Sequence, residues 1–272
     1  MKKFLSEKTV LLCGAGKMGS ALLQGWIAHG LEANKVTVIE PNPSKWLMSL
    51  KNHGLNLNSR IIAEPEICII AVKPQNVKKV TLELNLKQKR NVLFLSIAAG
   101  IKIARLEEFL GAESAIIRAM PNTPASIRKG VSCLIQNHRV TDAQMDLTEA
   151  LFSVVGKTIR LNDESQMDAV TAISGSGPAY IFYMIEVLTL AGINLGLEPN
   201  LAQKLATLTV SGAGLLAEIS DSAPNKLRNN VTSPNGTTEA ALKVLMDKEK
   251  GLSPLIRDAV AAANARSKEL DS

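Results

Sequence analysis

A strand, a tight glycine turn and a helix follow one another between Val10 and Gly30, and this stretch constrains the fold most strongly. The apolar run Val10–Cys13 leads into three glycines at the spacing G-x-G-x-x-G, and apolar residues at helical spacing follow to Ile27. In such a unit the first glycine makes the turn, the second lets a pyrophosphate reach the backbone, and the third lets the helix pack on the strand. The stretch therefore predicts a dinucleotide site at the N-terminus of a helix. The alternative is an α/β turn that binds no cofactor.

The overall composition limits the class of partner. The chain has 272 residues, 46% of them hydrophobic and 21% charged, as in ordinary soluble globular proteins, and it is long enough for two domains. Its net charge of +6 is modest, and no cluster of Lys and Arg carries interleaved aromatic residues for base stacking. The sequence therefore argues against a nucleic-acid surface and favours a slightly basic protein that handles small anions.

Cysteine spacing and hydropathy bear on the compartment. Cys13, Cys68 and Cys133 lie far apart in apolar runs, without the spacing of zinc ligands or of a disulfide framework. We therefore expect buried thiols in a reducing compartment and no metal site. The N-terminus has no secretory pattern, and the apolar stretch Pro178–Leu197 contains Glu186 and predicts a buried bundle helix, not a membrane span. A cytoplasmic protein without a membrane partner is expected.

Two more apolar runs are typical of central parallel strands, which are buried on both faces. They are Ile67–Val72, which ends in Lys73-Pro74, and Val92–Ile97, which ends in Ala98-Ala99-Gly100. Ligands bind beyond the carboxyl ends of parallel strands, so both ends should join the glycine turn at one edge of the sheet. The small residues after the second strand would let a nicotinamide ribose come close, whereas Lys73 is equally well explained as a solvated lysine.

The end of the strand Val36–Ile39 bears on the choice of nucleotide. Glu40 follows it about 20 residues after the glycine turn, where an acid accepts hydrogen bonds from the adenosine ribose hydroxyls. That position favours NADH and repels the extra phosphate of NADPH. If Glu40 points away, Asn42 and Ser44 are free to bind that phosphate, and Glu40 is then only a solvated acid at a strand end. The sequence leaves both interpretations open.

The remaining segments of the first half complete one fold class. Ala115–Arg118 and Lys157–Leu161 are expected strands, and Val131–Gln136 alternates weakly, as an edge strand does. Thr141 is expected to cap an amphipathic helix that ends near Val154. Together these segments predict an α/β fold, with a doubly wound Rossmann-type sheet of about eight strands in a dinucleotide-binding domain of residues 1–162.

From Glu164 onward the strand pattern stops, and residues 163–272 are predicted to form an all-helical domain. Long apolar helices are expected at Pro178–Leu195 and Leu201–Ile219, and two more are expected to begin at Thr237 and Leu252. This domain has more apolar surface than its own chain is expected to cover. We therefore expect it to bind substrate and to pair with a second copy of itself as a dimerisation domain.

A polar turn between these helices carries the second chemical signal. Ser233-Pro234-Asn235-Gly236 runs directly into a predicted helix start at Thr237-Thr238. The free N–H groups of a first helical turn, aided by the helix dipole, suit a small carboxylate, and the hydroxyls of Ser233 and Thr238 can donate to it. The alternative is an ordinary helix cap, a role that Ser and Thr serve very often.

Six motifs together resemble the pyrroline-5-carboxylate reductase family over nearly the whole chain. The first recurs in many dehydrogenases, whereas the last two are specific in this order and separation. They are GAGKMG (14–19), AVKP (71–74), SIAAG (96–100), RAMPNTP (118–124), AVTAISGSGPAY (169–180) and NVTSPNGTT (230–238).

The resemblance implies a reductase that uses NADPH, with NADH as the alternative, and converts 1-pyrroline-5-carboxylate to L-proline in the last step of proline biosynthesis. It also implies homodimers through the helical domain, or rings of such dimers. The implied cofactor contacts, to which the ribose argument adds Glu40 and Asn42, are Gly14, Ala15, Gly16, Lys17, Met18, Gly19, Ala71, Val72, Lys73, Pro74, Ala98, Ala99, Gly100 and Asn230. The implied substrate contacts are Glu164, Ser233, Gly236, Thr237 and Thr238.

This sequence departs from the family pattern at two places. Asn235 stands where the family usually has a second glycine, so the turn needs a conformation that Asn tolerates, such as the left-handed region. The segment 58–66 is short for the usual helix, which leaves one ribose contact unassigned and makes Asn58 a candidate for it.

The expected chemistry needs neither a catalytic dyad nor a metal. The three histidines lie outside every motif and an imine is readily protonated in solution, so Thr238 is the catalytic candidate, orienting the ring nitrogen and relaying a proton. A hydroxyacid dehydrogenase of the same layout would need a Lys early in the second domain, and none lies between Glu164 and Leu201. A non-catalytic nucleotide sensor, the other alternative, would not require the turn at 233–238.

Overall fold

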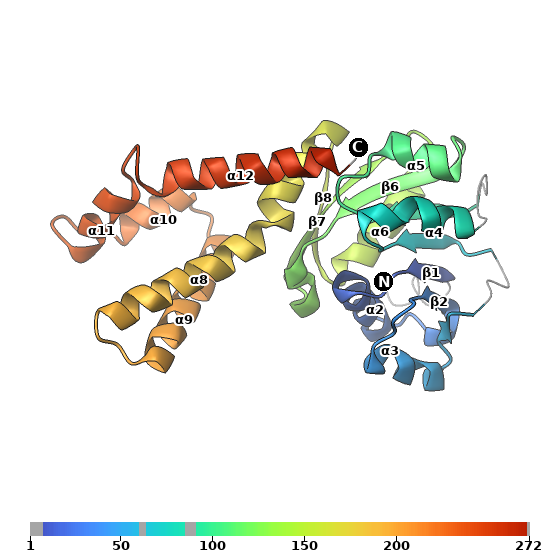
Figure 1. The fold of residues 1–272 in the computed structure, drawn as a ribbon, viewed down its shortest axis with the longest axis horizontal. Coiled ribbons are helices and arrows are strands. Elements are labelled where there is room, and N and C mark those ends of the chain that lie inside the picture. The colour runs from blue at the N-terminus through green and yellow to red at the C-terminus, as the bar shows by residue number, and fades with distance from the viewer. Residues whose placement is uncertain (1–7, 60–63, 85–90, 271–272) are drawn as a thin grey trace. The chain divides into compact units, whose positions relative to one another are not determined.

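The computed structural model describes residues 8–59, 64–84 and 91–270 of the chain. The chain divides into two compact units, of which the first is Met1–Gly175 with Ala263–Ser272 and the second is Ser176–Ala262. The first unit contains a sheet and its covering helices, and the second contains helices (Figure 1).

An eight-stranded sheet forms the centre of the first unit. Its strands are β1 (Val10–Cys13), β2 (Val36–Ile39), β3 (Asn56–Leu57), β4 (Ile67–Ile70), β5 (Leu93–Ser96), β6 (Ala115–Met120), β7 (Gly130–Gln136) and β8 (Gly156–Arg160). Their order across the sheet is β3-β2-β1-β4-β5-β6-β7-β8, and all neighbours are parallel except β6 and β7. The chain starts in the middle of the sheet and winds outward in both directions, which confirms the predicted doubly wound class.

Alternating strand residues feed two hydrophobic cores, one on each face of the sheet. The covering helices are α2 (Lys17–Ala28), α3 (Lys45–Ser49), α4 (Val77–Glu83), α5 (Ile103–Leu110) and α6 (Asp142–Ser153). Leu12 of β1 packs in the core that contains Trp26 of α2, whereas Leu11 packs in the core that contains Leu106 of α5. Helices α3 and α6 contribute to the first core and α4 to the second. Burial on both faces explains why these strands are continuous apolar runs in the sequence.

Local signals fix the starts of two of these helices, and the cap at Thr141 is the predicted one. Ser44 accepts a hydrogen bond from the N–H of Leu47 at 3.2 Å and so caps α3. Thr141 and Gln144 exchange hydrogen bonds in a full capping box at the start of α6. These caps satisfy N–H groups that the first turn of a helix otherwise leaves unpaired.

The structure differs from the prediction at the far edge of the sheet. The segment predicted as an edge strand, Val131–Gln136, lies inside the sheet as β7, so that interpretation is wrong. Ser132 interrupts its apolar pattern but is buried, and the mostly exposed β8 forms the edge instead. The last strand ends at Arg160, close to the predicted domain boundary at residue 162, whereas compactness divides the chain at Gly175 and returns residues 263–272 to the first unit.

The second unit covers very little of its own apolar surface. It contains α8 (Gly177–Asn194), α9 (Pro199–Ile219), α10 (Pro224–Asn230), α11 (Thr237–Leu245) and the first part of α12 (Leu252–Glu269). Helices α8 and α9 pack side by side as a hairpin, with Gly192 close to Ala202 (Figure 1). In this fully described unit, α9 buries Ala202 and Ala206, and α8, α10 and α11 bury no residue.

The apolar helix predicted to lie buried in a bundle is therefore exposed within the single chain. Phe182, Tyr183 and Leu190 of α8 are each more than half exposed, and Glu186 is exposed as well. By length and composition alone, the segment Glu164–Asn194 could cross a membrane. Exposed apolar surface of this extent marks an interface, either with another protein or with lipid.

Candidate active-site residues

The glycine turn between β1 and α2 is built as the sequence predicts. Gly14 has a φ of 94°, which favours glycine, and a Cβ atom there would lie 2.6 Å from the carbonyl oxygen of Ala71. A Cβ atom on Gly19 would collide with the carbonyl oxygen of Gly14, so this glycine lets α2 start directly against the strand end. The fold of the turn itself therefore requires two of the three glycines.

Gly16 is different, because its missing side chain leaves open space. Apart from its chain neighbours, no atom of the described chain lies within 4 Å of a Cβ built on Gly16, which is exposed together with Lys17. Helix α2 begins without a side-chain cap, so N–H groups of its first turn are available to an anion. An uncapped helix start with open space at the second glycine fits the pyrophosphate of a dinucleotide.

The ends of β4 and β5 meet this turn at one edge of the sheet. Ala71 follows β4 and donates its N–H to the carbonyl oxygen of Cys13 at 2.7 Å, which holds the segment 71–74 beside the turn. Lys73 in this segment is exposed. Strand β5 is parallel to β4, so residues 98–100 follow at the same edge. The structure thus brings three of the predicted cofactor segments together.

Gly100 is small for a reason that the sequence does not reveal. Its φ is 81°, and a Cβ atom there would collide with the Cβ of Leu270 and lie 3.0 Å from the carbonyl oxygen of Ser267. Ala98 is buried, and Ala99 is half-buried. The packing of the protein's own C-terminal segment therefore requires Gly100, and Ala99 is the most accessible of the three residues.

The carboxylate of Glu40 points into the glycine turn. Its Oε2 accepts a hydrogen bond from the N–H of Ala15 at 2.8 Å, and its Oε1 accepts one from the N–H of Asn42 at 2.9 Å. Ser44 meanwhile serves as the cap of α3. Of the two interpretations that the sequence leaves open, the conformation in which Glu40 points away is not the one found in the structure.

The side chain of Asn58 holds the main chain of Glu40. Its Oδ1 accepts from the N–H of Glu40 and its Nδ2 donates to the Glu40 carbonyl oxygen, each at 2.8 Å. Asn58 itself has a φ of 53°, a left-handed conformation that Asn tolerates better than most residues. Each end of the amide thus makes one hydrogen bond to the main chain of Glu40, which makes Asn58 a support of Glu40.

A buried ion pair joins β6 to the segment after β8. The side chain of Arg118, 5% exposed, pairs with Oε1 of Glu164, and this oxygen also accepts the N–H of Ile103 at 2.8 Å at the start of α5. Arg118 receives no role from its motif alone, although a cation inside an apolar strand signals a buried partner. Glu164, an implied substrate contact, thus has one oxygen engaged in tying three elements of the first unit together.

The polar turn of the second unit has the predicted helix start. Helix α11 begins at Thr237 with Gly236 as its N-cap residue, and no side chain caps it. The N–H groups of its first turn are therefore available to an anion. Asn235 has a φ of 58°, which confirms the left-handed conformation expected of it.

Two hydrogen bonds shape this turn. The N–H of Asn235 donates to Oε2 of Glu239 at 2.7 Å, and the N–H of Gly236 donates to the carbonyl oxygen of Ser233 at 3.0 Å. A Cβ atom on Gly236 would lie 2.5 Å from Oγ of Ser233, so this position has no room for a side chain. Thr238 is half-buried just inside the helix start.

The implied site residues therefore form two groups. The first unit holds the glycine turn, Glu40 with Asn42, the two strand-end segments and Glu164. The second unit holds the turn from Ser233 to Thr238, with Asn230 at the end of α10 shortly before it.

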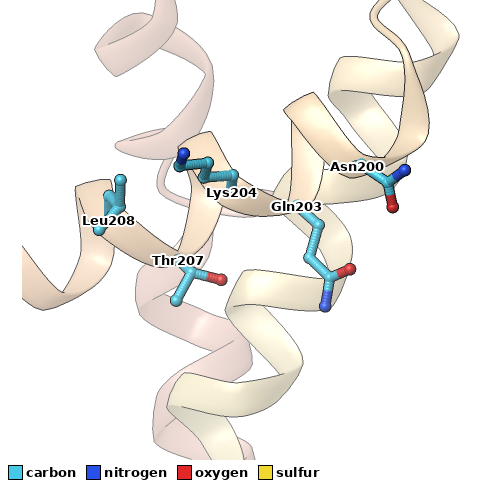
Figure 2. Close-up of a pocket in the computed structure, with 5 residues that line it drawn as sticks. All are labelled: Asn200, Gln203, Lys204, Thr207 and Leu208. Carbon is cyan, nitrogen blue, oxygen red and sulfur yellow. The ribbon is translucent and has the colours of Figure 1, made fainter.

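A surface pocket on α9 contains none of these residues. Its lining residues recur at the spacing of one helix face and are all exposed. They are Asn200, Gln203, Lys204, Thr207 and Leu208 (Figure 2). This face brings together no acid–base pair and no activated nucleophile, so we assign it no catalytic role.

The doubly wound sheet and its open glycine turn, joined to a helical unit, define the class of NAD(P)-dependent oxidoreductases. Residues 8–100 match the family model described as NADP oxidoreductase, coenzyme F420-dependent, and residues 164–270 match the model for pyrroline-5-carboxylate reductase dimerisation. The chain belongs to the pyrroline-5-carboxylate reductase family. The exposed helices lie within the matched dimerisation domain, and the protein is accordingly a homo-oligomer.

Known relatives match along almost the full length. The chain is 39% identical to a pyrroline-5-carboxylate reductase of Pseudomonas aeruginosa, over 98% of each chain. A solved pyrroline-5-carboxylate reductase from Coxiella burnetii is 35% identical with a TM-score of 0.87, covering 97% of this chain and 99% of that one. The structure of the Plasmodium falciparum pyrroline carboxylate reductase with NADP bound is 30% identical with a TM-score of 0.85, covering 98% and 100%.

Proposed function

We propose that this chain reduces 1-pyrroline-5-carboxylate to L-proline with NAD(P)H, the last step of proline biosynthesis. Two observations carry the proposal: the chain matches a reductase of this name over 98% of each chain, and it has an uncapped helix start at 236–238 that suits the substrate carboxylate. Family membership supplies the reaction, and the geometry assigns parts of it to particular residues.

The nucleotide is held by the first unit. The turn at Gly16 supplies free N–H groups and open space for the pyrophosphate, and the adenosine ribose lies toward Glu40 and Asn42. The segments 71–74 and 98–100 flank the nicotinamide half, with Ala99 the most accessible residue of the second segment. We also assign Asn230 to the nucleotide, on the family resemblance alone.

The substrate is held by the second unit. The N–H groups of Thr237 and Thr238 at the start of α11 bind the substrate carboxylate, and the helix dipole favours its negative charge. Ser233 donates a further hydrogen bond from its hydroxyl, and Gly236 lets the turn close tightly against Ser233. We also assign Glu164 to the substrate, on the family resemblance alone; within the first unit its side chain is held by the ion pair with Arg118.

The reaction needs one hydride and one proton. When bound, the reduced nicotinamide supplies the hydride to the imine carbon, and the ring nitrogen takes up a proton. Thr238 orients the ring through a hydrogen bond between its hydroxyl and that nitrogen and relays the proton from solvent. Correct positioning accounts for most of the catalytic effect, because the imine is protonated readily without a strong acid.

The exposed apolar helices bear on the assembly of the protein, and its free cysteines bear on its cellular compartment. We propose a homodimer through α8 and α9, or a ring of such dimers, since these helices carry the uncovered apolar side chains. The three cysteines are free and buried. A hydrogen bond with Cys13, together with burial, raises the pKa of Cys68, so this thiol is poorly reactive. Free thiols support a reducing, cytoplasmic location. We propose no membrane partner and, because no cluster of Lys and Arg carries interleaved aromatic residues, no nucleic-acid partner.

A single assay tests the reaction. In one set of reactions, purified protein is mixed with 1-pyrroline-5-carboxylate and either NADH or NADPH. In a parallel set, it is mixed with a panel of 3-hydroxy acids and the oxidised nucleotides. We expect oxidation of the reduced nucleotide with the pyrroline substrate and no turnover of the hydroxy acids. Turnover of a hydroxy acid would favour a hydroxyacid dehydrogenase, and binding of nucleotide without any turnover would indicate a sensor. Either result would overturn the proposal.

A further inference from the structure

At the adenosine end of the nucleotide site, the carboxylate of Glu40 is held in place by hydrogen bonds from two segments of the protein. Glu40 directly follows β2, and the neighbouring strand β1 leads into the glycine turn, so the two segments lie next to each other. The N–H of Gly14 donates to the carbonyl oxygen of Ile39 at 2.8 Å, which continues the pairing of the strands into the turn. Glu40 is half-buried there and is not a freely moving surface acid.

Both oxygens of this carboxylate are oriented by main-chain donors. Oε2 accepts from Ala15 within the glycine turn, and Oε1 accepts from Asn42 on the following loop. Each carboxylate oxygen has two lone pairs, so each can accept one further hydrogen bond. The free lone pairs suit the two hydroxyl donors of an adenosine ribose, whereas a 2′-phosphate offers acceptor oxygens and negative charge in place of one donor.

Asn58 fixes the main chain that carries this carboxylate. Its own N–H donates to the carbonyl oxygen of Val38 at 2.8 Å, one residue beyond the end of β3. From that position its side-chain amide pairs with both the N–H and the carbonyl oxygen of Glu40, as a further strand residue would. A shift of the Glu40 main chain would therefore break the hydrogen bonds to Asn58, and rotation of its side chain would break those to Ala15 and Asn42.

Within the described part of the chain, no ion pair cancels the charge of Glu40. Among the ion pairs of the described residues none involves Glu40, which is bound instead by neutral N–H groups. A phosphate at the ribose 2′ position would thus face an uncompensated carboxylate at short range. Like charges brought together in this way cost affinity.

We infer that Glu40 makes this chain prefer NADH over NADPH, and that Asn58 is the positioning residue that holds Glu40 in place. The inference rests on the proposed function for the use of a reduced nicotinamide nucleotide, and it adds the class of nucleotide that the site selects. Glu40 contacts the ribose hydroxyls, and Asn58 acts through Glu40 without touching the ribose.

Calorimetric titration of the full-length protein, without substrate, tests this selection. The ligands are NADH and NADPH, followed by ADP-ribose and its 2′-phosphate, which report on the adenosine end alone. We expect NADH to bind more tightly than NADPH by at least about tenfold, and ADP-ribose to exceed its 2′-phosphate by a similar factor. Equal binding, preference for NADPH or failure to bind either nucleotide overturns the inference.

The variant Glu40→Gln keeps the shape of the side chain and removes its charge. We expect it to tighten NADPH binding and weaken NADH binding, so that the ratio of the two Kd values moves by about tenfold or more toward NADPH. Glu32→Gln is the matched control, because Glu32 is an exposed acid of the same segment and the same charge is removed there. A ratio that stays unchanged in Glu40→Gln, or that moves equally in Glu32→Gln, contradicts the assignment.

The role of Asn58 is tested by measuring the ratio of the NADH and NADPH Kd values in the variant Asn58→Ala. A purely structural defect would weaken the binding of both nucleotides equally. If Glu40 is instead released from its position, NADH binding weakens and the electrostatic repulsion of the NADPH 2′-phosphate is reduced. Asn56→Ala is the matched control, since Asn56 is an exposed asparagine on β3 that does not contact Glu40. Failure of this inference can be distinguished from failure of the proposed function. Turnover of the pyrroline substrate with a preference for NADPH refutes the inference and leaves the proposed function intact.

Discussion

The two units differ in how much of their apolar surface the chain itself covers. Strands β1, β4 and β5 are buried at every position, and a hydrophobic core lies on each face of the sheet. In the helical unit, α8 buries no residue and α9 buries only two alanines. Because burial of apolar surface is the main favourable term in folding, the first unit is stabilised by its own contacts, whereas we expect the second to depend on another copy of the chain.

The same difference extends to the two candidate sites. The glycine turn is anchored between two central strands, and its conformation is enforced by contacts with Ala71 and with the turn itself. The turn at 233–238 lies between two short helices of the exposed unit. We therefore expect nucleotide binding to survive disruption of the assembly, and reduction of the substrate to depend on it.

Disruption of the apolar face of α8 should give the largest effect. Phe182→Glu places a charge on a side chain that is 58% exposed in the single chain, and we expect association to weaken by more than about 100-fold and turnover to be lost. Light scattering after gel filtration measures the mass, and calorimetry should show NADH affinity within a few-fold of normal. Leu82→Glu in α4, where the side chain is 56% exposed, is the matched control and should leave assembly intact. An unchanged mass in Phe182→Glu would contradict the comparison of the units.

A side chain at position 16 should instead impair nucleotide binding by the first unit and leave the assembly intact. Gly16→Val fills the open space of the turn, so nucleotide affinity should fall by about 100-fold or more while thermal stability and oligomeric mass stay normal. Gly19→Ala provides the contrast, because its Cβ would collide with the Gly14 carbonyl and lower the melting temperature. Normal NADH binding by Gly16→Val would refute the placement of the pyrophosphate.

Loss of the Thr238 hydroxyl should affect chemistry without affecting the nucleotide. In Thr238→Ala we expect kcat to fall by about ten- to 100-fold, with the Kd of NADH nearly unchanged, because the ring nitrogen loses its hydrogen-bond partner. Steady-state kinetics and calorimetry measure the two quantities. Thr207→Ala removes an exposed hydroxyl from the pocket on α9 and should have no effect. If kcat is unchanged in Thr238→Ala, Thr238 has no part in the mechanism.

The smallest effect is expected at the strained turn residue. Asn235→Ala forces a residue with a Cβ and no polar side chain into a φ of 58°, at a cost of about 1 kcal/mol. The KM for the substrate should rise several-fold as the turn loosens, while Asn235→Gly should retain normal KM. Equal KM values for the alanine and glycine variants would show that the left-handed conformation does not matter for substrate binding.

Much of the sheet was predictable because its signals are local. Apolar runs of four to six residues marked β1, β4 and β5, and Thr141 indicated the start of α6. The two-residue strand β3 is too short to show periodicity and was not predicted. The buried Ser132 interrupts the apolar pattern of β7, which was therefore mistaken for an edge strand. Helix α8 was found from its composition, but whether its apolar face is covered depends on partners that no periodicity reveals.

The candidate sites divide in the same way. The glycines at 14 and 19 were predictable, since the steric requirements of a turn fall on residues close in sequence, and the left-handed Asn235 followed from the family resemblance. The supports of the site were not, because they come from distant segments. Asn58 reaches Glu40 across 18 residues, and Arg118 reaches Glu164 across 46.

By itself, then, the sequence determined the doubly wound sheet, the glycine turn and the family, because spacing and backbone sterics are local properties of the chain. Only the tertiary structure decided that Glu40 points into the turn, that Asn58 holds it there and that Gly100 makes room for Leu270. Each of these depends on a hydrogen bond or a close contact between segments that the fold alone brings together. The orientation of a side chain is set by such partners, and a sequence pattern does not contain them.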